Sequence, residues 1–462
     1  MQRTLGARRL EEFARACGGR LVGADRPYLA VSTDTRTLSR GELFVALRGP
    51  HFNGNDFVIA AEGKDAAGAL VDTEQRVGLS QIVVADTQKA LEQAAYHWRI
   101  LFTLPVIGVA GSNGKTTAKE MTAQILSQSG ACLATRGNLN THIGVSLTLL
   151  RLEAEHRYAV VEVGANHPGE VASLVKIARP TIGLITNAGA EHLEGFGSLE
   201  GVARAEGEMV EGLDARGIAV LNADDAFIDL WRGLTRARVV TFGVQKPADF
   251  SASEINVDRS AGGFTTHFKL SSPIGEAVIE LQLAGEHNVV NALAAAAAAA
   301  SAGATLEHIV AGLAAMRAVR GRLQLKTARS GAWIIDDSYN ANPTSVRAGI
   351  EVLAQLEGRR WLVLGDMAEL GEFGEAAHKE AGEYARTHGV ERLFAMGPLA
   401  KLAAESFGAG AEVFADADSL ARALDSAARA DVRMLIKGSR INRLERVVEA
   451  LTQIKKDQAK EG

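Results

Sequence analysis

The chain has 462 residues, of which 47% are hydrophobic and 23% charged, and its formal net charge at pH 7 is −5. Because a domain usually holds roughly 100–200 residues, this length predicts several domains, and the weak negative charge without a basic cluster excludes a typical nucleic-acid-binding protein. The two cysteines, Cys17 and Cys132, are too few for a disulfide framework, so a reducing compartment is expected.

Residues 1–97 predict a small α/β domain. The segment opens with a charged amphipathic stretch and lacks the apolar core of a signal peptide. Short apolar runs at 43–47 and 68–72 then alternate with polar loops, as expected for strands of a small sheet.

Residues 98–320 predict a central domain with a parallel sheet and helices on its faces. Four short β-branched runs, each ending in glycine or polar residues, are the candidate strands: 104–110, 158–164, 181–189 and 217–224. Helical stretches lie between several of them. Ligands bind such sheets beyond the carboxyl ends of the strands. A more alternating stretch at 250–283 predicts antiparallel strands at one edge.

Residues 321–462 repeat the alternation of strand and helix and predict a Rossmann-like C-terminal domain. Its candidate strands are 332–338, 360–367, 392–397 and 433–439. The fold class is therefore α/β with three domains, and we place the last boundary between Val319 and Arg322.

No stretch predicts a membrane segment. The longest apolar tract, from Ala292, is almost all alanine, which favours a close-packed helix over a membrane span. A cytoplasmic protein without membrane insertion is expected.

Residues 108–117, GVAGSNGKTT, predict a phosphate-binding loop between a strand and a helix. Glycines let backbone amides approach phosphate oxygens, Lys115 supplies charge and the Thr116 hydroxyl can reach Mg²⁺. The general phosphate-loop pattern, G-x-x-x-x-G-K-S/T, would place glycine at 109, where this chain has Val109. A tight glycine turn that binds no nucleotide is the alternative.

Two further residues follow neighbouring strands of the central domain. Glu162 ends one strand and suits Mg²⁺, which prefers carboxylate oxygens. His192 follows the next strand and is a less usual magnesium ligand, so a surface histidine is the alternative. The histidines and cysteines lack zinc spacing, and no G-x-S-x-G hydrolase elbow is present.

Together these motifs resemble the Mur ligases, ATP-dependent amide-bond-forming enzymes of peptidoglycan synthesis. The superfamily, which includes the folylpolyglutamate synthases, shares GSNGKTT, the strand ending in Glu162, the spacing of Asn187 and His192, and residues 285–295. The glycine pattern of the family's phosphate loop differs from the general one, which accounts for Val109 in place of glycine. Residues 32–49 are similar to the uridine-nucleotide domain of the later-acting ligases. Five stretches are similar to the branch that adds a dipeptide: 137–152, 162–171, 192–203, 336–345 and 364–372.

The resemblance implies ATP and Mg²⁺ as cofactors, and UDP-muramoyl-tripeptide and D-alanyl-D-alanine as small-molecule partners. Nothing in the sequence demands more than a monomer. ATP would phosphorylate the terminal carboxylate of the tripeptide to an acyl phosphate, the amine of the dipeptide would attack, and phosphate would leave. The protein would mainly position the reactants and neutralise charge.

The resemblance also implies roles for individual residues. The nucleotide-binding set is Gly111, Ser112, Asn113, Gly114, Lys115, Thr116, Thr117, Asn187, Asn288, Arg322 and Asp337. The catalytic set is Lys115, Glu162, His192, Glu206 and Arg322, and the metal set is Thr116, Glu162, His192 and Glu206. The substrate-binding set is Ser32, Thr33, Asp34, Arg36, Asn138, Asn140, Asn340, Asn342, Lys437, Ser439 and Arg440, and a solvated loop face is the alternative for the last five.

Glu206 marks a departure from the family pattern. Many members carry a carbamylated lysine shortly after the HLEGFGS segment, and the register of residues 201–210 puts Glu206 at that position. We hypothesise that its carboxylate replaces the carbamate, acting through a water if its shorter reach requires one. An exposed helix glutamate is the alternative.

Two other functions fit part of the pattern. Another ligase of the superfamily should lack the segment at 32–49, and a nucleotide-controlled switch would not need the third domain with its DDSYNANP segment. For the ligase, in-line phosphate transfer predicts that the domains close about a hinge near Val319 to Gly321.

Overall fold

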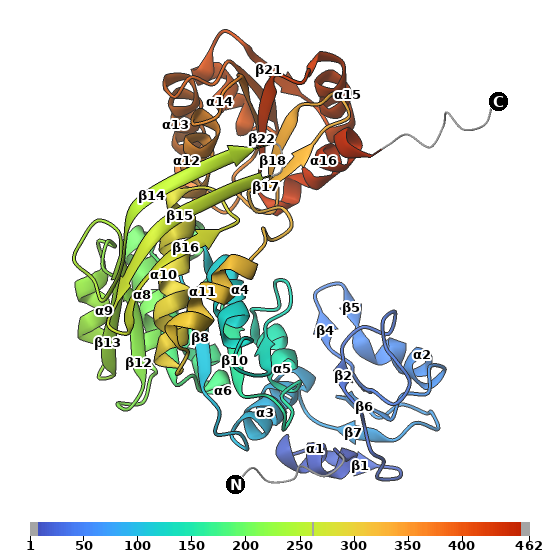
Figure 1. Cartoon of the computed structure of the whole chain (residues 1–462). Coiled ribbons are helices and arrows are strands. Elements are labelled where there is room, and N and C mark those ends of the chain that lie inside the picture. The colour runs from blue at the N-terminus through green and yellow to red at the C-terminus, as the bar shows by residue number, and fades with distance from the viewer. Residues whose placement is uncertain (1–7, 261–262, 454–462) are drawn as a thin grey trace, which may run out of the picture.

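The computed structural model describes residues 8–260 and 263–453, and it has three α/β lobes in chain order (Figure 1). The N-terminal lobe lies beside the central one, and the C-terminal lobe lies at the opposite end of the molecule. The predicted fold class, three α/β domains with parallel sheets, is confirmed.

The N-terminal lobe is built on a five-stranded sheet of order β1-β7-β6-β3-β2, in which only β1 is antiparallel to its neighbour. Its elements are α1 Leu10–Ala16, β1 Arg20–Val22, β2 Val31–Ser32, β3 Leu43–Val45, β4 Arg48–Gly49, β5 Phe52–Asn53, η1 Gly54–Phe57, α2 Val58–Glu62, β6 Gly68–Val71 and β7 Gln81–Val83.

Helix α3 (Thr87–Arg99) joins the N-terminal lobe to the central one. The Asp86 side chain caps it by accepting from the backbone amides of Gln88 and Lys89, which would otherwise lack partners. The helix packs on α5 (His142–Leu149) and α6 (Glu170–Ala178) of the central lobe. The boundary predicted at residue 97 therefore falls in the last turn of this helix.

The central lobe holds a nine-stranded sheet of order β16-β15-β14-β13-β12-β11-β8-β10-β9. Strands β8 to β13 are parallel, and their buried apolar runs explain why sequence located four of them. The further elements are β8 Val106–Ala110, α4 Lys115–Leu126, β9 Cys132–Ala134, β10 Tyr158–Glu162, β11 Ile182–Ile185, α7 Leu193–Phe196, α8 Leu199–Glu211, β12 Ile218–Asn222, α9 Ile228–Leu234, β13 Arg238–Gly243, α10 Glu286–Ser301 and α11 Leu306–Ala315.

The predicted antiparallel edge is present as β14 (Phe250–Ser260), β15 (Gly263–Ser272) and β16 (Gly275–Leu281). Strands β14 and β15 form a long hairpin that extends from the central lobe to the C-terminal lobe (Figure 1). Near its end Phe264, 5% exposed, belongs to the same hydrophobic cluster as Ile335 and Val346 of the C-terminal lobe. The hairpin therefore connects the two cores.

The alanine tract forms the middle of α10, where every residue from Ala292 to Ala299 is buried. Small side chains let this helix pack closely on α4, which carries the predicted phosphate loop at its start. Within the described residues, no helix is both long and apolar enough to cross a membrane.

The C-terminal lobe has a six-stranded sheet of order β17-β18-β22-β19-β20-β21, with only β17 antiparallel. All four predicted strands are present. The elements are β17 Gln324–Thr327, β18 Trp333–Asp337, α12 Pro343–Ala354, β19 Arg359–Gly365, η2 Gly371–Phe373, α13 Gly374–Thr387, β20 Arg392–Met396, α14 Ala400–Phe407, β21 Ala411–Phe414, α15 Ala417–Ala427, β22 Val432–Lys437, η3 Arg440–Asn442 and α16 Glu445–Thr452.

Candidate active site

The phosphate loop lies where the sequence predicts it, between the end of β8 and the start of α4. Gly111 and Gly114 have φ values of 119° and 82°, which L side chains rarely adopt. A Cβ atom at Gly114 would also collide with the side chain of Asn291 on α10. The glycines thus allow the turn and bring the N-terminal amides of α4 to face a cavity, as anion binding requires.

That cavity has a volume of about 560 Å³ and lies between the central and C-terminal lobes. Most predicted site residues line it: Ser112, Asn113, Gly114, Lys115, Thr116, Thr117, Asn138, Asn140, Glu162, Asn187, His192, Asn288, Arg322, Asp337, Asn340, Asn342 and Lys437. The predicted residues Gly111, Glu206, Ser439, Arg440, Ser32, Thr33, Asp34 and Arg36 are not among the described residues that line it.

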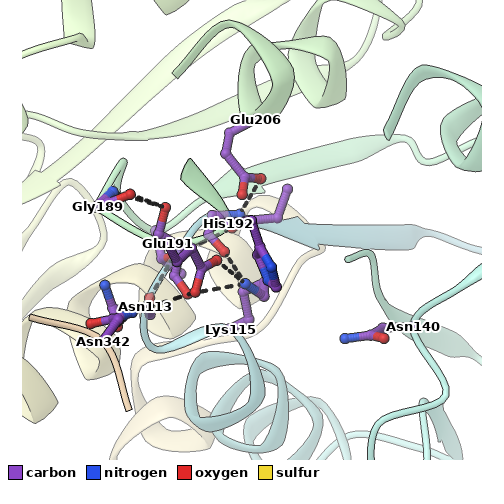
Figure 2. A network of polar contacts seen from close by, with 12 residues as sticks. Asn113, Lys115, Asn140, Gly189, Glu191, His192, Glu206 and Asn342 are labelled. Carbon is purple, nitrogen blue, oxygen red and sulfur yellow. Dashed lines mark hydrogen bonds and ion pairs between the residues drawn. The ribbon is translucent and has the colours of Figure 1, made fainter. Parts of the chain in front are cut away.

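Lys115 lies at the centre of a polar network (Figure 2). Its Nζ donates to Glu191 Oε1 at 2.9 Å, to Ser112 O at 3.0 Å and to Gly111 O. Burial lowers the pKa of this ammonium, but the surrounding carboxylates, Glu191 first, outweigh that effect and the net pKa is raised. The lysine therefore stays charged, as a phosphate ligand must.

Asn187, in the segment that follows strand β11, holds the loop in place. Its Oδ1 accepts from the backbone amide of Asn113 at 2.9 Å, and its Nδ2 donates to the carbonyl of the same residue at 2.9 Å. Because both groups of the amide are used, Asn187 fixes the shape of the loop, and its predicted contact with nucleotide stays a prediction.

Glu162 presents a free carboxylate oxygen beside the loop. Its Oε1 accepts from Asn140 Nδ2 at 3.0 Å and from Thr116 Oγ1 at 3.3 Å. Its Oε2 is buried and has no hydrogen-bond partner among the residues that the structure describes. A buried carboxylate oxygen without a partner is costly unless a cation or another donor satisfies it. Arg322 reaches the same place from the C-terminal lobe, with Nη2 3.1 Å from Thr116 Oγ1.

His192 adopts a left-handed backbone conformation, with φ 49°, at the start of α7. Its Nδ1 lies 2.5 Å from Glu369 Oε2, a residue of the C-terminal lobe. This contact was missing from the sequence analysis, because nothing in the motifs links these two distant segments. His192 thus lies at the junction of the two lobes, beside the cavity.

Glu206 lies on helix α8 behind the loop. Its side chain is 6% exposed, so the alternative interpretation, an exposed glutamate on a helix surface, is wrong. Its Oε2 accepts from the backbone amide of Gly111 at 2.6 Å. Burial raises the pKa of its carboxyl to about 7, although the charge of Lys115 opposes the shift. Glu206 therefore supports the loop from helix α8, within electrostatic reach of its lysine (Figure 2).

The C-terminal lobe contributes an ion pair to the cavity wall. Lys437 Nζ lies 2.5 Å from Asp337 Oδ2 and donates to the carbonyl of Asn340 at 2.9 Å. Asn288, from α10, lines the cavity with its Nδ2 bonded to the Ala284 carbonyl at 2.7 Å. These polar groups face the same space as the phosphate loop.

Two predicted substrate residues of the C-terminal lobe lie just outside the cavity. Ser439 is 4% exposed, and its hydroxyl donates to the Ala341 carbonyl at 3.1 Å and accepts from the Ala368 amide at 2.9 Å. Arg440 pairs with Glu445 at 3.0 Å on the surface. Ser439 therefore orients neighbouring loops, whereas Arg440 is engaged in an ion pair outside the cavity lining.

The predicted N-terminal substrate residues form a separate polar turn on the surface of their lobe. Asp34 pairs with Arg36 at 2.7 Å, and this guanidinium lowers the pKa of the Asp34 carboxyl to about 2. Ser32 Oγ accepts from the Asp34 amide at 3.3 Å, and Thr33 lies between them. A ligand that reaches both this turn and the cavity would have to be long.

The sequence analysis missed Glu191, Glu369 and Asn291. Glu191 directly precedes His192 in the loop after β11, where an acidic residue at a strand end was the available signal. The other two are recognisable only from contacts between distant segments. The arrangement as a whole offers an anion-binding loop, a buried carboxylate suited to a cation, and cationic groups from two lobes around one cavity.

Comparison with known proteins identifies the family. The family profile of the Mur ligase middle domain matches residues 109–299, and that of the Mur ligase glutamate ligase domain matches residues 321–440. The UDP-N-acetylmuramoyl-tripeptide--D-alanyl-D-alanine ligase of Escherichia coli K12 is 44% identical over 446 residues, which is 96% of this chain and 98% of that protein.

Solved structures agree in fold over the same length. A crystal structure of MurF from Acinetobacter baumannii superposes with a TM-score of 0.89 at 34% identity and covers 97% of this chain and 99% of that one. MurF ligase from Thermotoga maritima, solved in complex with ADP, gives a TM-score of 0.79 at 26% identity, covering 91% of this chain and 96% of that one. The chain therefore belongs to the Mur ligase family.

Proposed function

We propose that the protein is an ATP-dependent ligase that joins D-alanyl-D-alanine to UDP-N-acetylmuramoyl-tripeptide in peptidoglycan synthesis. The observation that carries this proposal is the 44% identity, over 96% of the chain, to a relative named for that reaction. The cavity supports it, because the phosphate loop and groups of the C-terminal lobe face one space.

The chemistry follows from the weakness of a carboxylate as an electrophile. The terminal carboxylate of the tripeptide attacks the γ-phosphorus of ATP, forming an acyl phosphate and releasing ADP. The amine of the dipeptide then attacks the acyl carbon, loses a proton, and the C–O bond to phosphate breaks. Lys115 and Arg322 would hold the phosphate oxygens, so the protein contributes mainly orientation and charge neutralisation.

The residues present fit a magnesium ion. Glu162 offers a buried oxygen without a partner among the described residues, and the Thr116 hydroxyl lies beside its other oxygen. Within the described part of the chain, no group of three or more His, Cys, Asp or Glu side chains could hold a metal by itself. Phosphate oxygens would therefore complete the ligand set, and Mg²⁺ bound there would neutralise charge that develops on the transferred phosphoryl group.

Glu206 would take the place of a carbamylated lysine from behind the loop, and because it does not line the cavity it would act on a metal there through a water. Its burial and its proximity to Lys115 support a role at the loop, and its bond to the Gly111 amide gives it a fixed position. We expect activity independent of added bicarbonate. A requirement for bicarbonate, or full activity in Glu206→Ala, would show that the carboxylate has no such role.

The remaining assignments complete the proposal. The turn at Ser32, Asp34 and Arg36 would bind the uridine nucleotide, so that the muramoyl-peptide spans from the N-terminal lobe to the cavity. Asn138, Asn140 and Asn342 would contact the peptide or the incoming amine. The protein would act as a monomer in the cytoplasm.

The test is phosphate release from Mg·ATP with tripeptide and D-alanyl-D-alanine supplied separately and then together. The diaminopimelate tripeptide is the first substrate to try, since one solved relative, from Acinetobacter baumannii, is named for diaminopimelate. We expect release only with both substrates, together with a product of pentapeptide mass. Release that is indifferent to both substrates would contradict the proposal and favour a nucleotide switch.

A further inference from the structure

The ammonium of Lys115 donates hydrogen bonds to three acceptors of the protein itself. Its three acceptors are Glu191 Oε1, the Ser112 carbonyl and the Gly111 carbonyl. A lysine ammonium has three protons, so these acceptors use all of them. A phosphate oxygen can therefore bind Lys115 only by displacing one acceptor.

Glu191 is the acceptor that a phosphate would replace most directly. The two carbonyls belong to the loop itself, whereas Glu191 lines the cavity and carries a negative charge like that of phosphate. The side chains of Glu191 and Lys115 are 11% and 16% exposed, so water screens their attraction only weakly. Two anions next to each other would repel, so Glu191 and a phosphate cannot share Lys115 without cost.

The second oxygen of Glu191 faces the C-terminal lobe. Asn342, the N-cap residue of α12, directs its Nδ2 toward Glu191 Oε2 at 3.4 Å and donates to Asn113 Oδ1 at 2.8 Å (Figure 2). Its own Oδ1 accepts from the Ser345 amide at 2.9 Å and is fixed by the cap. Glu191 thus contacts the loop lysine with one oxygen and the neighbouring lobe with the other.

We propose that Glu191 is a positioning residue that competes with nucleotide phosphate for Lys115: it pairs with Lys115 and contacts Asn342, and a bound phosphate displaces it. It holds the lysine charged and folded back, and it holds the two lobes together at the cavity. The inference rests on the proposed function only in that the loop binds the phosphates of a nucleotide.

The alternative role is a ligand to the metal, directly or through water. The two roles predict opposite effects of removing the charge. A group that competes with phosphate makes nucleotide binding weaker than it could be, whereas a metal ligand makes binding of the magnesium complex stronger. Binding of ADP without magnesium isolates the first effect.

The experiment measures binding of magnesium-free ADP and of Mg·ADP to the full chain by calorimetry, for the native protein and for Glu191→Gln. The matched control is Glu170→Gln, which removes one charge from the same cavity wall, where Glu170 accepts from the Asn166 amide at 2.7 Å. We expect Glu191→Gln to bind magnesium-free ADP about tenfold more tightly. The control should stay close to the native affinity.

A thermal melt without nucleotide gives the second readout. Glu191→Gln should melt at a lower temperature than the native protein, because the ion pair is lost in the empty state. Weaker stability with tighter ADP binding is a combination that a merely structural role would not produce. An unchanged or weaker affinity for magnesium-free ADP, or a loss confined to Mg·ADP, would overturn the inference while leaving the proposed function intact. Failure of the native protein to bind ADP at all would contradict both.

Discussion

At the scale of single residues, the buried carboxyl of Glu206 should leave a signature in the pH dependence of stability. Its pKa rises from 4.5 to about 7 in the folded protein, chiefly through burial. Between pH 4.5 and about pH 7, the Glu206 carboxyl of the folded protein therefore holds a proton that the unfolded chain has lost. The stability that this proton contributes is present below about pH 4.5 and is lost as pH rises through 7, by up to about 3 kcal/mol.

Glu206→Gln tests this, because the amide cannot ionise and keeps an acceptor for the Gly111 amide. In denaturant unfolding without metal, the stability of the native protein should fall relative to that of the variant when the pH is raised from 5 to 8. Glu211→Gln, at the exposed end of the same helix, is the control and should follow the native protein. Equal pH dependence in all three proteins would mean that Glu206 does not take up a proton in this range.

The residues of the loop were readable from sequence because their roles are local. Gly111, Gly114 and Lys115 follow from what a phosphate needs, and Glu162 from its place at the end of a strand. Glu191 was not identified, because an acidic residue in a polar loop has no pattern of its own until the lysine beside it is known. Contacts between lobes, such as the one between His192 and Glu369, depend on how the domains pack and leave no local trace.

At the scale of elements, helix α13 holds the loop that carries Glu369 to His192. His378 on this helix is fully buried, and its Nε2 accepts from the Met367 amide at 2.9 Å while its Nδ1 faces the Gly374 carbonyl at 2.6 Å. The ring is thus neutral, with the proton on Nδ1. Burial lowers its pKa below 6.5, so protonation of the unfolded chain favours unfolding as pH falls below 6.5.

We therefore expect the stability of the native protein to fall relative to that of His378→Gln, which cannot take up the proton, when the pH is lowered from 7.5 to 5.5. Melting temperatures across the range measure the difference. His388→Gln, a half-buried histidine near the end of the same helix, serves as the comparison. A pH dependence unchanged by His378→Gln would contradict the assignment of the neutral ring.

The strands that could be predicted from the sequence are those with continuous buried apolar runs. Strands β8, β10, β11 and β12 are buried almost throughout, and so their composition identifies them. Strand β21 was missed because it is an edge strand whose residues are half-buried or exposed, which makes its composition resemble a loop. Helix α3 crosses the predicted boundary because a helix that packs on two lobes has no change of composition where one lobe ends.

At the scale of the whole molecule, two connections join the C-terminal lobe to the central lobe in addition to the contacts at the cavity. One is the chain itself near Val319 to Gly321, where Gly321 has φ 71° and allows a turn that a larger residue would disfavour. The other is the hairpin of β14 and β15, which the sequence predicted as strands but not as a link between lobes. If the lobes close about this hinge, as in-line phosphate transfer predicts, we expect the hairpin to restrict that motion.

Phe264→Ala tests that restriction. The ring is buried in a cluster with residues of the C-terminal lobe, and removal of a buried phenylalanine side chain costs about 3–5 kcal/mol of packing, which here includes contacts that link the lobes. We expect a larger radius of gyration by small-angle scattering without substrates, and a raised KM for ATP, because Arg322 and Asn342 would meet the phosphate loop less often. Val278→Ala, on β16 of the same sheet but 71% exposed, should change neither quantity. A radius of gyration that matches the native protein, with ATP kinetics also unchanged, would show that the hinge region and the contacts at the cavity position the lobe without the hairpin.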